Sequence, residues 1–304
     1  MMIVESRGQV PGAAQDVPLI EARGIIKHYD GFSLDNVSLS VSEGEVVGFV
    51  GKNGAGKSTT IKALLGLIDL DGGEGFILGV PSNELSRPVH AGAKERIGVV
   101  FDTISMPGHL RVADVGRVFS HAYASWNPRM FEQLTHDFDL AATKQVKELS
   151  RGMGMKLSLA CALSHDARVL ILDEATAGLD PMARDELLDR LLDFVAMPGR
   201  AILMSSHITS DLERIADRVL CIDEGRIVFD LAKTKSPTRW VLPAAAWRSS
   251  SASAQAASSP RASCVIARTT MASTCSFPIA LSSPRTSPTF RATGCPSTTI
   301  SPLP

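Results

Sequence analysis

The feature that most constrains this chain is a glycine-rich segment, Gly51–Ser58, which follows a short apolar run. That run, Val46–Val50, is apolar throughout, as expected of a strand buried on both faces of a parallel sheet. Helical periodicity then extends from Lys57 to Leu67. Glycines let the backbone turn its N–H groups toward a phosphate group, and the following helix presents the positive end of its dipole. The segment therefore predicts a phosphate-binding loop; a chance match is expected in roughly one chain of this length in a hundred.

Two side chains of the loop carry its chemistry. Lys57 can reach the β- and γ-phosphates of a nucleotide, and the Ser58 hydroxyl can ligate Mg²⁺. We therefore expect a nucleoside triphosphate and Mg²⁺ as ligands; the loop alone leaves GTPases, kinases, helicases and transporter ATPases open. The positions expected to contact the nucleotide are Gly51, Asn53, Gly54, Ala55, Gly56, Lys57, Ser58 and Thr59.

A second apolar run, Val169–Leu172, ends in two acids. Asp173 could hold Mg²⁺ through water, and Glu174 could orient and deprotonate an attacking water. A strand that ends in two solvated acids is common in itself. This pair gains significance because it lies about 110 residues after the loop and is followed by Ala177–Asp180.

The segment Leu149–Met153 predicts the start of a further helix. Ser150 is a plausible N-cap, and Gly152 permits close approach of a backbone. A helix N-terminus with a free hydroxyl is a second phosphate-binding device. Because one γ-phosphate has no need of two such devices from one chain, the second would serve a neighbouring subunit.

Six features follow one another along the chain: Tyr29, the loop Gly51–Ser58, the helix start at Ser150, the acids Asp173 and Glu174, the segment Ala177–Asp180, and His207. In this order and spacing they resemble the nucleotide-binding subunits of ATP-binding cassette (ABC) transporters. The resemblance covers roughly residues 19–230.

The resemblance implies roles for the outlying members. Tyr29 would stack on adenine, and Ser150 and Gly152 would touch the γ-phosphate bound to the partner subunit. Asp180 would cross the dimer interface, and His207 would contact the γ-phosphate and support the catalytic carboxylate. Lys57, Glu174 and His207 are thus the expected catalytic residues. Taken alone, a tyrosine near a strand is usually a packing residue, and a histidine after a strand is usually structural.

Several positions depart from the family pattern. Arg151 and Met153 stand where Gly and Gln are usual, and Ala175 replaces a proline. The strand Ile97–Phe101 is followed by Asp102 in place of Gln; its carboxylate can still bind Mg²⁺ through water but lacks an amide donor. These variants resemble a branch of bacterial subunits that serves multidrug and peptide-antibiotic exporters.

The expected fold is α/β, with a P-loop NTPase core built on a mainly parallel sheet. The resemblance adds an N-terminal antiparallel β subdomain and an inserted α-helical subdomain at about 103–150. Residues 1–18 are predicted to be a flexible leader and 19–230 the ABC ATPase domain. Further strands are expected at Leu19–Tyr29, Ser33–Val41, Ala201–Met204, Val219–Ile222 and Arg226–Phe229.

Residues 231–304 differ in composition from the rest of the chain. They contain eight Lys or Arg and no acid, whereas the remainder has 23 basic and 32 acidic residues. Their Ser, Thr, Pro and Ala content cannot bury enough apolar surface to offset chain entropy, so disorder is expected. A basic arm for acidic surfaces is one interpretation, and translation in a shifted reading frame is another.

Compartment and partners follow from further absences in the sequence. There is no signal-peptide pattern and no apolar stretch of about 18 residues, so a cytoplasmic domain bound to a separate multi-span permease is expected. A second ABC subunit, as a homodimer, would complete the site, and no nucleic acid is expected as a partner. The alternatives are a soluble ABC-type ATPase in cluster assembly or DNA repair, or a C-terminally damaged relic that only binds ATP.

Overall fold

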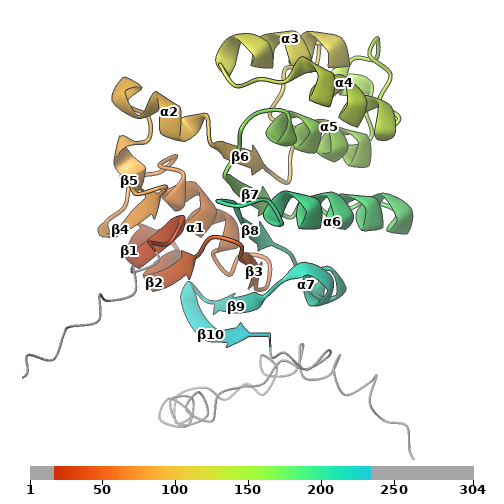
Figure 1. The fold of residues 1–304 in the computed structure, drawn as a ribbon. Helices are drawn as coiled ribbons and strands as arrows, with labels where there is room; N and C mark the ends of the chain where they lie inside the picture. Colours follow the sequence, from red (N-terminus) through yellow and green to blue (C-terminus); the bar gives the residue numbers. More distant parts are fainter. Residues whose placement is uncertain (1–16, 234–304) are drawn as a thin grey trace, which may run out of the picture. The chain divides into compact units, whose positions relative to one another are not determined.

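The computed structural model describes residues 17–233. Residues 1–16 of the predicted leader (1–18) and 234–304 of the predicted tail (231–304) lie outside the described residues, whereas Leu231 and Ala232 belong to the last strand. Figure 1 shows the arrangement of the elements. In chain order they are β1 (Ile20–Tyr29), β2 (Phe32–Val41), β3 (Val46–Val50), α1 (Lys57–Leu64), β4 (Gly72–Ile77), β5 (Val80–Pro81), α2 (Ala91–Lys94), β6 (Ile97–Val100), α3 (Val112–Ala122), α4 (Pro128–Asp137), α5 (Arg151–Leu163), β7 (Val169–Asp173), α6 (Pro181–Val195), β8 (Ala201–Ser205), α7 (Thr209–Ile215), β9 (Arg218–Asp223) and β10 (Arg226–Ala232).

The larger sheet has the strand order β10-β9-β3-β8-β7-β6. All its neighbours pair in parallel except β10, which forms an antiparallel hairpin with β9. The predicted α/β fold with a mainly parallel sheet is confirmed. Strand β3 lies between β8 and β9, so the loop that follows it emerges at the carboxyl edge of the parallel strands.

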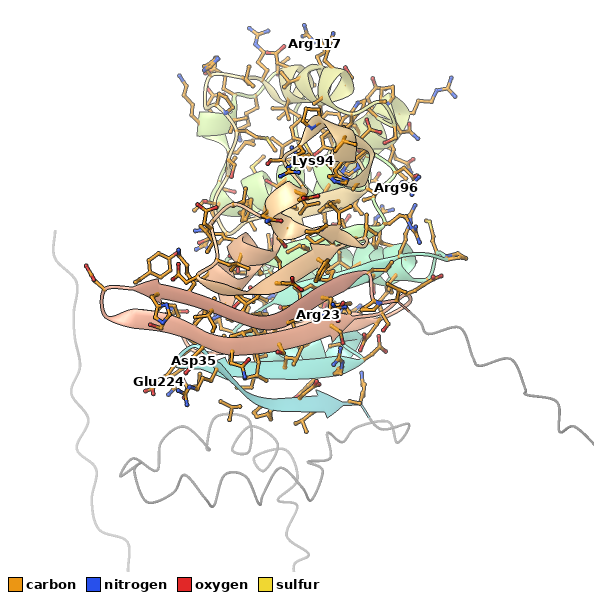
Figure 2. All side chains as sticks on the ribbon, turned by 90° about the vertical axis from the view of Figure 1, so that its left-hand side faces the viewer. Arg23, Asp35, Lys94, Arg96, Arg117 and Glu224 are labelled. Atoms are coloured by element: carbon orange, nitrogen blue, oxygen red, sulfur yellow. The ribbon has the colours of Figure 1, made fainter. Side chains whose placement is uncertain are left out.

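A smaller antiparallel sheet has the order β2-β1-β4-β5. The strands β4 and β5 were not predicted, because β4 contains three glycines and has little strand propensity of its own. Pairing with β1 imposes its conformation. The two sheets meet near Asp35 of β2, whose N–H donates to the carbonyl of Gly225 at 2.9 Å. Figure 2 shows Asp35 beside Glu224 in the β9–β10 turn.

Alternate residues of the parallel strands face two different layers, as the period of two in a strand requires. Val47 and Phe49 of β3 point into the core shared with α1 and the antiparallel sheet. Gly48 faces α7 instead, and a Cβ there would lie 3.0 Å from the Leu212 side chain. In Figure 1 the helices α5, α6 and α7 accordingly lie on the opposite side of the sheet from α1.

The helix after the glycine-rich loop is shorter than predicted. It ends at Leu64 and not at Leu67, because Gly66 adopts a left-handed φ of 65°. The N–H of Gly66 donates to Ala63 O at 3.0 Å, and that of Leu67 donates to Lys62 O at 2.9 Å. This pair of bonds is a Schellman C-cap, which terminates a helix.

The segment between β6 and α5 contains the helices α3 and α4, within the range predicted to be helical. Both pack against α5. The loop before them also reaches α5, because a Cβ at Gly154 would lie 1.9 Å from the Ile104 Cδ1. The boundaries of the helical subdomain, at about 103–150, and of the ABC ATPase domain, at 19–230, remain predictions from the sequence. Among residues 17–233, no helix combines the length and the apolar character that crossing a membrane requires.

Candidate nucleotide-binding site

Lys57 lies at the base of the glycine-rich loop, where it is 6% exposed. Its Nζ donates to the carbonyl oxygens of Gly51, at 2.7 Å, and Lys52, at 3.3 Å. These bonds hold the ammonium group inside the curve of the loop. Because α1 has no side-chain cap, its first N–H groups are open to an anionic partner.

Two glycines of the loop are required by their surroundings. A Cβ at Gly51 would lie 2.4 Å from the carbonyl oxygen of Ile222 in β9. Gly56 adopts a φ of 115°, and a Cβ there would lie 2.6 Å from the Leu34 side chain. The loop is therefore packed tightly on its protein side. On the other side, a Cβ at Gly54 would meet nothing within 4 Å.

The two acids at the end of β7 have different environments. Asp173 is 2% exposed, and its Oδ1 accepts a hydrogen bond of 2.6 Å from the Ser205 hydroxyl. Glu174 has a left-handed φ of 54°, which is unfavourable for a residue with a side chain. Its N–H donates to the Ser205 side chain at 3.1 Å. Ser205 thus fixes both acids, through a parallel register that pairs Asp173 with Ser205.

The Glu174 carboxylate joins the loop to His207. Its Oε2 lies 2.5 Å from His207 Nδ1, and its Oε1 lies 3.3 Å from Lys57 Nζ. Oε1 is buried and has no hydrogen-bond partner among the described residues. A buried carboxylate oxygen without such a partner is poised to accept a proton or a hydrogen bond from a bound water.

The oxygen groups expected to hold Mg²⁺ come from separate segments. Ser58 is on α1 and Asp173 ends β7, while Asp102 is exposed just after β6. Within residues 17–233, no group of three or more His, Cys, Asp or Glu side chains could hold a metal ion by itself. These oxygens fit Mg²⁺, which is usually held by one or two carboxylates together with substrate phosphates.

A hollow of about 530 Å³ lies at the start of α5. It contains Ser150, Gly152 and Asp180, but none of the residues of the glycine-rich loop. Ser150 caps α5 by accepting from Met153 N–H at 3.2 Å. Asp180 caps α6 in the same way by accepting from Ala183 N–H at 3.0 Å, and this bond lowers the pKa of its carboxyl group.

Tyr29 and Arg151 are both exposed. Tyr29 ends β1 with 46% of its surface accessible, and Lys27 Nζ lies 5.7 Å from the centre of its ring. It is therefore not a core packing residue. Arg151 lies beside Gly178, with its Cδ 3.5 Å from the position of a Cβ there. Its exposure agrees with a side chain that points to solvent.

The thiols of the described region are not reactive groups. Burial raises the pKa of the Cys161 thiol well above its usual range. Burial also raises the pKa of Cys221 to about 11, although Cys221 is only half-buried. Both therefore remain protonated near neutral pH.

The structure thus brings together Lys57, Asp173, Glu174 and His207, while Ser150, Gly152 and Asp180 form a separate group. One residue that the candidate set lacked is Ser205. Its position at the carboxyl end of an apolar strand is visible in the sequence, but its pairing with Asp173 appears only in the register of β7 with β8.

Comparisons with known proteins agree with this geometry. The model of the family described as ABC transporter matches residues 34–177. The Nod factor export ATP-binding protein I of Sinorhizobium fredii is 36% identical over 219 residues, covering 69% of this chain and 62% of the relative. The protein of the same name from Burkholderia orbicola is 38% identical over 213 residues, covering 68% of each.

Solved structures share the fold. An ATP-binding subunit of an ABC transporter is 28% identical with a TM-score of 0.63, covering 70% of this chain and 90% of that one. A dimeric ATP-binding cassette in a post-hydrolysis state, bound to ADP and Pi, is 20% identical with a TM-score of 0.64. It covers 70% of this chain and 98% of that one, and at this identity it supports the fold alone.

The P-loop fold and the family predicted from the sequence are therefore confirmed. The chain belongs to the ABC transporter family, as an ATP-binding cassette of the kind that hydrolyses ATP.

Proposed function

We propose that two copies of this chain bind two ATP molecules between them and that ATP hydrolysis powers export through a separate membrane permease. The observation that carries the proposal is the separation of two phosphate-facing groups on one chain. Lys57 and Glu174 lie together, whereas Ser150 and Asp180 line the separate hollow at the start of α5. Each group is half of a site, and a two-fold dimer would place each half against the other.

In this proposal Lys57 and the open N–H groups of α1 hold the phosphates. Glu174 Oε1 accepts the proton of the attacking water, whose oxygen bonds to the γ-phosphorus as the bond to the β–γ bridging oxygen breaks. The products are ADP and inorganic phosphate. His207, bonded to Oε2, keeps the carboxylate oriented. Mg²⁺, bound through Ser58 and Asp173, would neutralise charge on the phosphate oxygens.

Tyr29, Gly152 and Asp102 complete the proposed site. Tyr29 offers an exposed ring for stacking on a base. Gly152 lines the same hollow as Ser150, where it would touch the phosphate bound to the partner subunit. Asp102 is exposed at the carboxyl end of β6, beside the strand that ends in Asp173. It would contact Mg²⁺ through water.

Export and membrane attachment are proposed from the relatives, which are named for export of Nod factor. We place the chain at the inner face of the cell membrane, held there by its permease. The test is phosphate release by the purified chain, followed by co-purification with the membrane proteins of the native cell. ATPase activity together with a multi-span partner supports the proposal. Activity without a membrane partner would favour a soluble cassette, and binding without turnover would favour a relic.

A further inference from the structure

One ion pair between α6 and α7 is too long to be a hydrogen bond. Arg184 Nε lies 3.9 Å from Asp211 Oδ2, and both atoms are buried with no hydrogen-bond partner among the described residues. Asp211 is 2% exposed. Leaving a buried donor and a buried acceptor unpaired is unfavourable. We therefore expect a second conformation in which Arg184 and Asp211 form a hydrogen bond.

Arg184 touches the loop that contains Asp180. Its Nη2 donates to the carbonyl oxygen of Leu179 at 3.2 Å. Leu179 and Asp180 line the hollow at the start of α5 together with Ser150. A shift of this loop therefore moves the Arg184 guanidinium directly.

Asp211 is connected to the other side of the site through α7, the helix on which it lies. It lies in the first turn of α7, which begins two residues after His207. The α7 start and the His207 loop are also joined by the bond from Ile208 N–H to the Ser206 side chain, at 3.0 Å. His207 in turn contacts Glu174. The Arg184–Asp211 pair is thus the buried link between the Asp180 loop and the His207 loop.

A second set of ion pairs joins the same helices but reaches neither loop. Arg214 of α7 pairs with Asp185 and Asp189 of α6, at 2.5 Å each. These acids are 66% and 62% exposed, and surface pairs contribute little to stability. They provide a matched control on the same two helices.

We propose that Arg184 and Asp211 are positioning residues. They transmit a movement of the Asp180 loop, caused by contact with a second copy, to the position of His207. When a second copy presses on that loop, Arg184 moves toward Asp211, and a displacement of about 1 Å completes the hydrogen bond. Closure sets α7 and His207 in the orientation that holds Glu174 for catalysis. The inference rests on the proposed dimeric ATPase and specifies how its two half-sites communicate.

The experiment compares ATP hydrolysis and thermal unfolding of four forms of the full chain: the parent, the double variant Arg184→Met/Asp211→Leu, Arg184→Lys, and the control Arg214→Met. The double variant removes both unpaired atoms together, so the fold is expected to keep or raise its unfolding midpoint. If the pair only stabilised the fold, the double variant would have a lower unfolding midpoint than the parent. Arg184→Lys keeps the positive charge opposite Asp211.

We expect the double variant to lower kcat roughly 5- to 30-fold, with KM for ATP within about twofold of the parent. Arg184→Lys should have a kcat much closer to that of the parent than the double variant has. The kcat of Arg214→Met should lie within about twofold of the parent value. The inference is overturned if the double variant turns over at the parent rate, if its only defect is a lower unfolding midpoint, or if Arg214→Met loses as much activity. A parent chain without ATPase activity would instead overturn the proposed function itself.

Discussion

At the scale of single residues, the contact between Glu174 and His207 determines what this site can do. The carboxylate Oε2 lies 2.5 Å from His207 Nδ1. Its Oε1, which has no hydrogen-bond partner among the described residues, lies 3.3 Å from the Lys57 ammonium group. We propose that this carboxylate accepts a proton from water and that Lys57 binds phosphate. Two predictions separate these roles.

Glu174→Gln should abolish hydrolysis while leaving ATP binding intact. The amide keeps the shape of the side chain but cannot accept a proton from water, and loss of a general base lowers turnover by about 10²- to 10⁴-fold. Phosphate release and nucleotide affinity, measured on the same preparation, check both halves of the expectation. Normal turnover in this variant would remove Glu174 from the role of base.

Lys57→Ala should weaken binding itself. The variant loses a charge-assisted bond to phosphate, which corresponds to roughly 10- to 150-fold in Kd for ATP. Lys52→Ala is the matched control, because Lys52 is in the same loop but is exposed and lies 3.6 Å from Asp223. Titration with a fluorescent nucleotide measures both. Equal losses of ATP affinity in the two variants would mean that Lys57 makes no specific contact with the phosphates.

Tyr29→Ala should also lower affinity, since stacking of a base on an aromatic ring contributes about 1–3 kcal/mol. Tyr29→Phe keeps the ring and should bind as the parent does. The ring is exposed, so neither change should move the unfolding midpoint. If Tyr29→Ala binds ATP as tightly as Tyr29→Phe does, the adenine is held elsewhere.

At the scale of elements, the β9–β10 turn supports the glycine-rich loop. Gly225 N–H donates to the carbonyl oxygen of Ala55 at 3.0 Å. The residue has a φ of 74°, and a Cβ there would lie 1.8 Å from the Ser33 backbone oxygen. A hairpin far along the chain therefore fixes the backbone that would hold phosphate.

Gly225→Ala should destabilise the fold by more than about 3 kcal/mol, because left-handed strain adds to a clash with rigid backbone. Gly79→Ala is the control: it has a φ of 75° but open space around it, so strain alone should cost about 1–2 kcal/mol. Denaturant unfolding of the two variants compares these free energies directly. Equal destabilisation would show that the contact with Ser33 is not rigid.

Elements with strong local patterns were predictable from the sequence, and contacts set by distant pairing were not. The buried run of β3 and the loop after it carry their own signals, as do the acids after β7. By contrast, β4 depends on β1, and the link from Ser205 to Asp173 depends on the register of β7 with β8. The C-cap at Gly66 was missed because the apolar pattern continues past it.

At the scale of the whole molecule, the proposed dimer would join two groups of residues that lie apart on one chain. Lys57 and Glu174 would bind ATP from one side, and the hollow with Ser150 would close it from the other. The loop identifies a nucleotide site, and the separate hollow is the reason to propose that a second copy completes it.

Sedimentation of the Glu174→Gln variant with Mg-ATP tests this composite site most directly. Because this variant should bind ATP without hydrolysing it, we predict a species of twice the mass of one chain. The dimer should dissociate when ADP replaces ATP, and adding Ser150→Arg should prevent it from forming. A variant that is saturated with ATP yet sediments as a monomer would contradict the account.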